Sequence, residues 1–214
     1  MSEQASIIDL DALHRAPRHE SPFPFTVIPH FLREEYREEI LKDFPAIASR
    51  GSYPLSQLKY GEAFGRLIAE LEGPDLREAI SSAFDVELAN RPTMITVRGA
   101  TGAQDGRIHA DTPSKLMTLL LYLNQEWDAA EGRLRILNNR NSLEDYVVEI
   151  PPAFGTCLVF KVTPNCWHGH KSFTGVRRAI QLNYVTDEAV LRRELSRHQM
   201  SARIKGLTNW FRRN

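Results

Sequence analysis

Two short motifs in this chain carry side chains that bind metals. His109-Ala-Asp111 lies near the middle, and Cys166-Trp-His168-Gly-His170 lies further along, with Arg177 and Arg178 shortly after it. A His-x-Asp pair with a more distant histidine is the ligand pattern of a two-histidine, one-carboxylate iron(II) site. Such a site leaves half of an octahedron open for small molecules. The spacing therefore predicts a metal centre with free coordination positions.

Each of these residues also has a simpler explanation. A His-x-Asp pair arises by chance in many chains, and Asp111 could cap a turn before Pro113. His168 could be a core or loop histidine beside Trp167, and His170 competes with it as the second imidazole ligand. The motifs must therefore be weighed with the elements that position them.

Short β-strands surround the motifs. His109 and Asp111 are two residues apart, so on one strand they would face the same side, at a strand end that follows the Gly-rich loop 99–107. Apolar or alternating runs predict strands at 93–98, 115–124, 133–137, 146–150, 155–162 and 179–185. Turn residues separate them and no helical pattern interrupts them. This order predicts a double-stranded β-helix (a cupin-like jelly roll) over about residues 93–186.

Helices are expected before this β region. Residues 1–20 are polar and mixed, so we expect a loose N-terminal leader. Residues 23–28 favour a short strand and 49–61 a loop, and helical spacing of apolar residues predicts helices at 33–44, 62–71 and 74–84. The expected fold is mainly β with flanking α-helices, in one domain over 21–186, followed by a basic helical segment at 187–214.

Composition excludes several classes of protein. The 214 residues include 27 Lys and Arg and 27 Asp and Glu, so no net charge favours nucleic-acid binding. Cys157 and Cys166 are too few for a disulfide scaffold. The N-terminus lacks the pattern of a signal peptide, and no apolar run reaches the about 18 residues that span a membrane. We expect a soluble, cytoplasmic protein whose oligomeric state stays open.

The segment 187–214 is locally basic. After residue 188 only Glu194 opposes seven basic residues: Arg192, Arg193, Arg197, Arg203, Lys205, Arg212 and Arg213. A helix that packs on the core with a solvated basic face explains this pattern, and contact with an anionic membrane surface is the weaker alternative.

Strand alternation separates the two neighbouring arginines. The face that carries Arg177 also carries the small or polar residues Ala179, Gln181 and Asn183. The face that carries Arg178 holds Ile180, Leu182 and Tyr184, which are suited to pack under helices. Because side chains alternate along a strand, Arg177 is predicted to point into a polar site.

Together these motifs resemble the Fe(II)/2-oxoglutarate-dependent dioxygenases, in particular their prolyl-4-hydroxylase-like branch. His109-Ala-Asp111, followed by Tyr122-Leu-Asn124 and Trp127, is similar to that branch's H-x-D…YLN-x-x-W run. His168 with the run from Gly175 to Gln181 is similar to its H…R-x-A/S-I run, and only His168 has the branch's nine-residue spacing to Arg177. The resemblance covers about residues 93–186.

The resemblance implies roles for five residues. His109, Asp111 and His168 would bind iron(II), Arg177 would pair with the distal carboxylate of 2-oxoglutarate, and Tyr122 would donate its hydroxyl to the same group. Without the resemblance, Tyr122 is better explained as a core aromatic. O₂ and a small-molecule or protein side-chain substrate would be the partners, ascorbate a candidate accessory cofactor, and succinate and CO₂ the products of a hydroxylation. A cupin-like module that binds metal or ligand without oxygenase turnover is the alternative.

One stretch departs from the family. Glu131-Gly132-Arg133 stands where the family often has two glycines, in a region that often lines its substrate mouth. This puts prolyl-peptide specificity in doubt. Arg98 is either a substrate contact or a solvated strand-end charge, and His170 and Arg178 have no assigned role. Asp111 favours hydroxylation, since halogenating members lack this carboxylate.

Overall fold

The computed structural model describes residues 5–196. The helical elements are α1 (Leu10–Arg15), η1 (Glu34–Tyr36), α2 (Arg37–Asp43), η2 (Leu55–Gln57), α3 (Glu62–Glu72) and α4 (Pro74–Phe84). The strands are β1 (Arg18–His19), β2 (Phe25–Ile28), β3 (Tyr53–Pro54), β4 (Thr93–Thr101), β5 (Lys115–Tyr122), β6 (Leu134–Leu137), β7 (Tyr146–Ile150), β8 (Cys157–Lys161), β9 (His168–His170) and β10 (Gly175–Val185).

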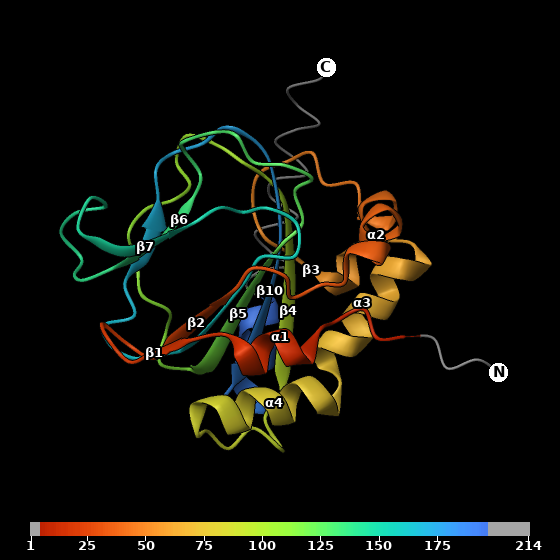
Figure 1. Ribbon diagram of the computed structural model, residues 1–214, viewed down its shortest axis with the longest axis horizontal. Helices are drawn as coiled ribbons and strands as arrows, with labels where there is room; N and C mark the ends of the chain where they lie inside the picture. The colour runs from red at the N-terminus through yellow and green to blue at the C-terminus, as the bar shows by residue number, and fades with distance from the viewer. Residues whose placement is uncertain (1–4, 197–214) are drawn as a thin grey trace.

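The strands form two antiparallel sheets that face each other. The larger sheet has the order β1-β2-β8-β5-β10-β4-β3, and the smaller has the order β7-β6-β9. Neighbours such as β10 and β4 are far apart in sequence, as the crossed connections of a jelly roll require. Figure 1 shows the helices gathered on one side of the molecule and β6 and β7 on the other. The expected fold, a mainly β jelly roll with flanking helices, is confirmed.

Alternation along the strands of the large sheet divides its side chains between two cores. On β10, Ile180 and Leu182 pack with the apolar faces of α3 and α4, whereas Ala179 faces the smaller sheet. On β5, Leu121 joins the helical core and Tyr122 the core between the sheets. This alternation follows from the period-two geometry of a strand. The site therefore lies between the sheets, and the helices stabilise the sheet from behind.

The predicted elements differ from the observed ones in a few places. The helix predicted over 33–44 begins as the 3-10 turn η1 and ends at Asp43. The loop predicted over 49–61 contains the short strand β3 and η2. Strand β9 was not predicted, because His168-Gly169-His170 has neither apolar alternation nor β-branched residues. Its pairing with β6 comes from long-range register.

The described part of the expected loose leader is folded. Residues Leu10–Arg15 form α1, with an Asp9 side chain that accepts from the Ala12 N–H, and Ile7 and Ile8 are almost fully buried. Glu70 of α3 accepts hydrogen bonds from the backbone N–H groups of Ile7 (3.0 Å) and Ile8 (2.9 Å). The expectation was wrong because two adjacent apolar residues in a polar segment leave no periodic signal, yet they complete the helical core.

The basic C-terminal segment is described only in part. Residues 188–196 are helical, and 197–214 lie outside the described residues together with 1–4. Within 5–196, no helix is both long and apolar enough to cross a membrane.

Candidate metal centre and cosubstrate pocket

The two candidate imidazole ligands are held together by their own backbones. An isolated antiparallel bridge joins His109 and His168: the N–H of His109 donates to the carbonyl of His168 (3.0 Å), and the reverse bond is 2.9 Å. Their ring centroids lie 4.3 Å apart. The bridge brings together two residues from distant parts of the sequence, as the motif spacing predicted.

Hydrogen bonds at Nδ1 orient both rings. Nδ1 of His109 lies 2.9 Å from the carbonyl oxygen of Arg107, and Nδ1 of His168 lies 2.8 Å from that of Cys166. A carbonyl oxygen can only accept, so each Nδ1 carries the proton. The Nε2 lone pair of each ring is then free for a metal, which is the usual way in which a protein sets the tautomer of a ligating histidine.

Asp111 supplies the carboxylate, although not from a strand. The prediction that it shares a strand with His109 was wrong: His109 forms only the isolated bridge, and Asp111 lies in the connection before β5, outside any strand. Thr118 donates to its Oδ2 at 2.5 Å, Lys115 Nζ lies 3.1 Å from its Oδ1, and Asn183 in turn donates to Thr118 at 2.8 Å. Pro113, two residues after Asp111, has no backbone N–H and so disfavours strand pairing in this stretch.

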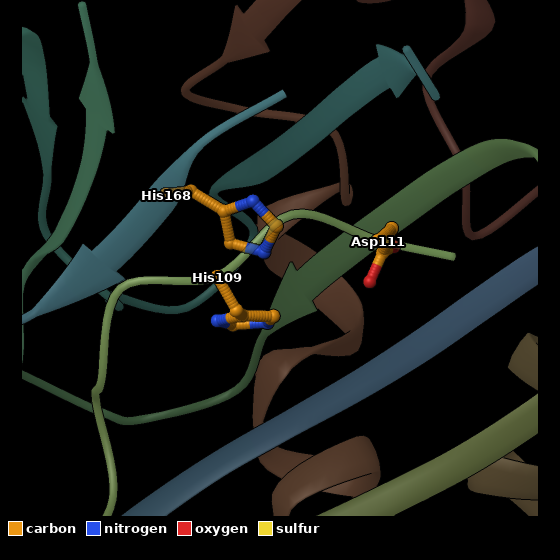
Figure 2. Close-up of side chains that lie close together, drawn as sticks. All are labelled: His109, Asp111 and His168. Carbon is orange, nitrogen blue, oxygen red and sulfur yellow. The ribbon is translucent and has the colours of Figure 1, made fainter. Parts of the chain in front are cut away.

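The ligand atoms of the three residues fit a single metal ion. One donor atom from each of His109, Asp111 and His168 lies within 4.8 Å of the others, and Figure 2 shows the two imidazole rings side by side with the carboxylate beyond them. His109 is exposed while His168 is buried, so the centre is open on one side. A borderline metal such as iron(II) suits this nitrogen and oxygen donor set.

The protonation states agree with metal binding near neutral pH. Burial, together with the charge of His109, lowers the pKa of His168 to about 4. Burial alone would raise the pKa of the Asp111 carboxyl, but Lys115 and His168, with the hydrogen bond from Thr118, hold it below its usual value. Ligation needs a neutral imidazole and an ionised carboxylate, and both forms prevail.

Arg177 lies inside the same cavity, as strand alternation predicted. Its side chain is buried, Nε donates to the Gly132 carbonyl at 2.8 Å, and Nη2 is buried with no hydrogen-bond partner among the described residues. The guanidinium sits 5.1 Å from the ring centroid of buried Tyr122. A buried cation with a free N–H group is costly unless an anion pairs with it, so this geometry fits a carboxylate of a ligand.

Arg178 lies on the other face. Its guanidinium stacks 5.1 Å from the ring of Phe44, and its backbone N–H donates to Asn124. It therefore belongs to the helical side of the sheet and not to the cavity.

The cavity joins the metal centre to the buried arginine. Its volume is about 300 Å³, and it is lined among others by His109, His168, Tyr122 and Arg177. His170 also lines it, with Nδ1 2.8 Å from its neighbour's carbonyl oxygen, and burial beside Arg177 lowers the pKa of His170 to about 4. His170 is thus a neutral cavity wall, set apart from the three donors that converge.

Sequence reasoning missed three residues around Asp111. Lys115, Thr118 and Asn183 hold the carboxylate from β5 and β10, and none stands in the motif. The i,i+4 spacing of Asp111 and Lys115 was the one local signal available. Thr118 and Asn183 become neighbours only through the register of β5 with β10.

Comparisons with known proteins agree with this geometry. Residues 97–185 match the model of the 2OG-Fe(II) oxygenase superfamily. No curated protein matches the chain in sequence. Among solved structures, a Pseudomonas putida prolyl-4-hydroxylase is 20% identical with a TM-score of 0.55, covering 83% of this chain and 97% of that one.

Two further structures have a similar fold. A Trichoplax adhaerens prolyl hydroxylase, solved with a peptide of a hypoxia-inducible factor, is 22% identical with a TM-score of 0.52, covering 82% of this chain and 86% of that one. A Phytophthora capsici prolyl 4-hydroxylase is 12% identical with a TM-score of 0.56, covering 87% of this chain and 68% of that one. Residues 97–185 therefore match the 2OG-Fe(II) oxygenase superfamily, and this match, together with the His109, Asp111 and His168 cluster, indicates an enzyme that uses iron(II) and 2-oxoglutarate.

Proposed function

We propose that this enzyme hydroxylates a carbon of its substrate while 2-oxoglutarate is converted to succinate and CO₂. In this proposal His109, Asp111 and His168 hold iron(II), and Arg177 and Tyr122 hold the distal carboxylate of 2-oxoglutarate. One observation carries the proposal: Arg177, whose buried Nη2 has no hydrogen-bond partner in the described chain, lines the same cavity as the candidate iron ligands His109 and His168.

Each residue has a defined task in this reaction. The bound iron and keto acid together supply the oxidising chemistry, and the protein supplies position and charge. The Nδ1 hydrogen bonds keep the two imidazoles turned toward the metal. Arg177 neutralises one carboxylate of the cosubstrate, because a planar guanidinium can bind a carboxylate through two parallel hydrogen bonds.

Tyr122 complements Arg177 from the neighbouring strand. Burial raises the pKa of Tyr122, despite the opposing charge of Arg177, so its hydroxyl keeps its proton and can donate to the carboxylate. Ala179 of β10 pairs with Tyr122 of β5, and its small side chain leaves space between Tyr122 and Arg177. Leu120 and Leu134 also line the cavity and add apolar surface beside the reacting groups.

Succinate formation tests the proposal directly. Purified protein with iron(II), 2-oxoglutarate and O₂ is expected to release succinate slowly even without substrate, and His109→Ala should abolish this. Arg177→Gln should weaken 2-oxoglutarate binding by roughly 100-fold, because charge-assisted bonds in a buried site are lost. Arg178→Gln is the matched control, since it removes the same charge from the opposite face.

The outcomes separate the competing functions. If 2-oxoglutarate binds with equal affinity to the Arg177→Gln and Arg178→Gln variants, the assignment of the cosubstrate site is wrong. If the wild-type protein binds metal and 2-oxoglutarate but forms no succinate with any substrate pool, a binding module without oxygenase turnover replaces the hydroxylase.

A further inference from the structure

A second arginine stands beside the cosubstrate pocket. On the sheet floor, Arg98 of β4 pairs with Ala179 of β10, and Ala179 pairs with Tyr122 of β5 on its other side. Residues opposite each other across neighbouring strands share a face, so all three point toward the smaller sheet. Since neighbouring strands lie about 4.8 Å apart, the Cα atoms of Arg98 and Tyr122 are roughly 10 Å apart, with the small Ala179 between them.

Arg98 lines the same cavity as Arg177, from the neighbouring strand β4. Both arginines border the cavity, with Thr96 and Gln181 as further polar lining. Arg98 is 27% exposed, whereas Arg177 is buried, so Arg98 lies toward the open side. A ligand group that enters from the open side would meet Arg98 first, whereas Arg177 lies at the buried end of the cavity.

The charges around Arg98 do not cancel. Two more arginines lie nearby: Arg107 lines the cavity and is exposed, and exposed Arg50 donates to Gln104, another lining residue. Asp105 is the one acidic side chain that lines the cavity in the described chain. A cleft with an excess of one sign attracts a ligand of the opposite sign.

The present contacts leave Arg98 able to bind a ligand. Nη1 lies 3.3 Å from Oδ1 of Asp105, and Nη2 donates to Ser52 at 3.2 Å. A guanidinium has more N–H donors than these two contacts use. Asp105 is itself engaged elsewhere, since its Oδ2 accepts from the Gly102 N–H at 2.8 Å. These contacts orient the guanidinium on the cavity wall.

We propose that the substrate carries a carboxylate and that Arg98 binds it, which makes Arg98 the residue that selects the substrate class. This inference rests on the proposed function. A carboxylate is favoured over a phosphate because Asp105 lies 3.3 Å from the guanidinium and repels the two charges of a phosphate more than the single charge of a carboxylate. The cavity of about 300 Å³ is at the small end for ligand pockets and is shared with 2-oxoglutarate, so the substrate is a compact acid or an acidic side chain.

The test measures binding to protein that is already loaded with manganese(II) and saturating 2-oxoglutarate, with oxygen excluded. Calorimetric titration uses short carboxylic acids, each with its primary amide and its phosphate monoester, and acidic peptides with their amidated counterparts. The wild type should bind at least one acid more tightly than its amide. Arg98→Gln should weaken that binding by about 10-fold to 100-fold, with 2-oxoglutarate affinity unchanged.

Asp105→Asn distinguishes ligand binding from a loop-anchoring role. If Arg98 binds the substrate, removal of its internal carboxylate partner should keep or strengthen binding of the acid. If Arg98 only anchors the loop that leads to His109, both variants should lose metal and acid binding together, and the proposal is overturned. Arg33→Gln, an exposed charge elsewhere, controls for net charge.

Other outcomes are equally decisive. If the amides or phosphate esters bind as well as the acids, the carboxylate assignment is overturned. Comparison of the affinity for free acids with the affinity for acidic peptides shows whether the carboxylate belongs to a small molecule or to a protein side chain. If 2-oxoglutarate itself fails to bind the manganese-loaded wild type, the proposed function fails instead.

Discussion

Replacement of Thr118 by Val should weaken metal binding although Thr118 is not itself one of the three candidate metal ligands. Thr118 donates to Asp111 Oδ2 at 2.5 Å and accepts from Asn183 at 2.8 Å. Thr118 and Asn183 are both buried side chains of the larger sheet. Valine has nearly the same shape, so the change removes one hydroxyl and little packing. Asp111 would then be free to turn away from the two imidazoles.

The expected size follows from that one hydrogen bond. A bond to a charged group contributes about 1.5–3 kcal/mol, and tenfold in affinity corresponds to about 1.4 kcal/mol. Metal affinity should therefore fall roughly 10-fold to 100-fold, which agrees with the usual effect of losing a partner of a metal ligand. Competition with a chromogenic chelator, with zinc(II) or cobalt(II) as the probe, measures this directly.

Lys115→Met provides a contrast with the opposite sign. Lys115 neutralises Asp111 in the metal-free protein, where their side chains are only 12% and 7% exposed. Its loss should destabilise the metal-free protein by about 3 kcal/mol, because a buried carboxylate is left without its cation. It also removes a cation that competes with the metal, so added metal should stabilise Lys115→Met more than the wild type.

The result that would refute this reasoning is specific. If Thr118→Val binds metal like the wild type, the hydrogen bond does not position Asp111. If Lys115→Met and Thr118→Val change the metal-induced shift in melting temperature in the same direction, the charge of Lys115 does not oppose the metal.

Other predictions concern the pocket, the pH dependence and the backbone. Tyr122→Phe should raise the KM for 2-oxoglutarate about 10-fold in the succinate assay by removing one donor to the carboxylate, and an unchanged KM would make Tyr122 a core aromatic only. His168 and His170 have pKa values of about 4 when folded and about 6.5 when unfolded, so the unfolded state binds protons first as the pH falls. Stability of the metal-free protein should thus drop by about 3 kcal/mol per histidine between pH 6.5 and pH 4 in urea titrations, and a flat profile would contradict the neutral, buried state. Gly106→Ala should cost stability and metal affinity, since Gly106 has φ +92° and a Cβ would lie 2.3 Å from the His170 carbonyl oxygen; wild-type behaviour in the chelator assay would show that the loop adapts. Glu70→Gln should speed proteolysis of the N-terminal segment, because the Glu70 carboxylate accepts hydrogen bonds from backbone N–H groups of that segment. Unchanged cleavage would mean that apolar burial alone holds the segment in place.

Local pattern in the sequence determined much of this protein. Apolar repeats at helical spacing predicted α3 and α4, and alternation on β10 placed Arg177 in the cavity and Arg178 toward the helices. Such predictions succeed because the face on which a side chain lies depends only on the period of its own element. The His-x-Asp spacing identified His109 and Asp111, and the family resemblance selected His168 over His170; these three residues converge in the structure.

Tertiary structure alone decided how those residues are held. The backbone bridge between His109 and His168 and the contacts of Asp111 with Thr118 depend on which strands become neighbours and in what register. The burial of Ile7 under the helices and the row from Arg98 to Tyr122 have the same origin. Contacts between distant segments carry no local period, so the sequence indicates the metal and the cosubstrate, while the shape and charge of the substrate pocket emerge only from the fold.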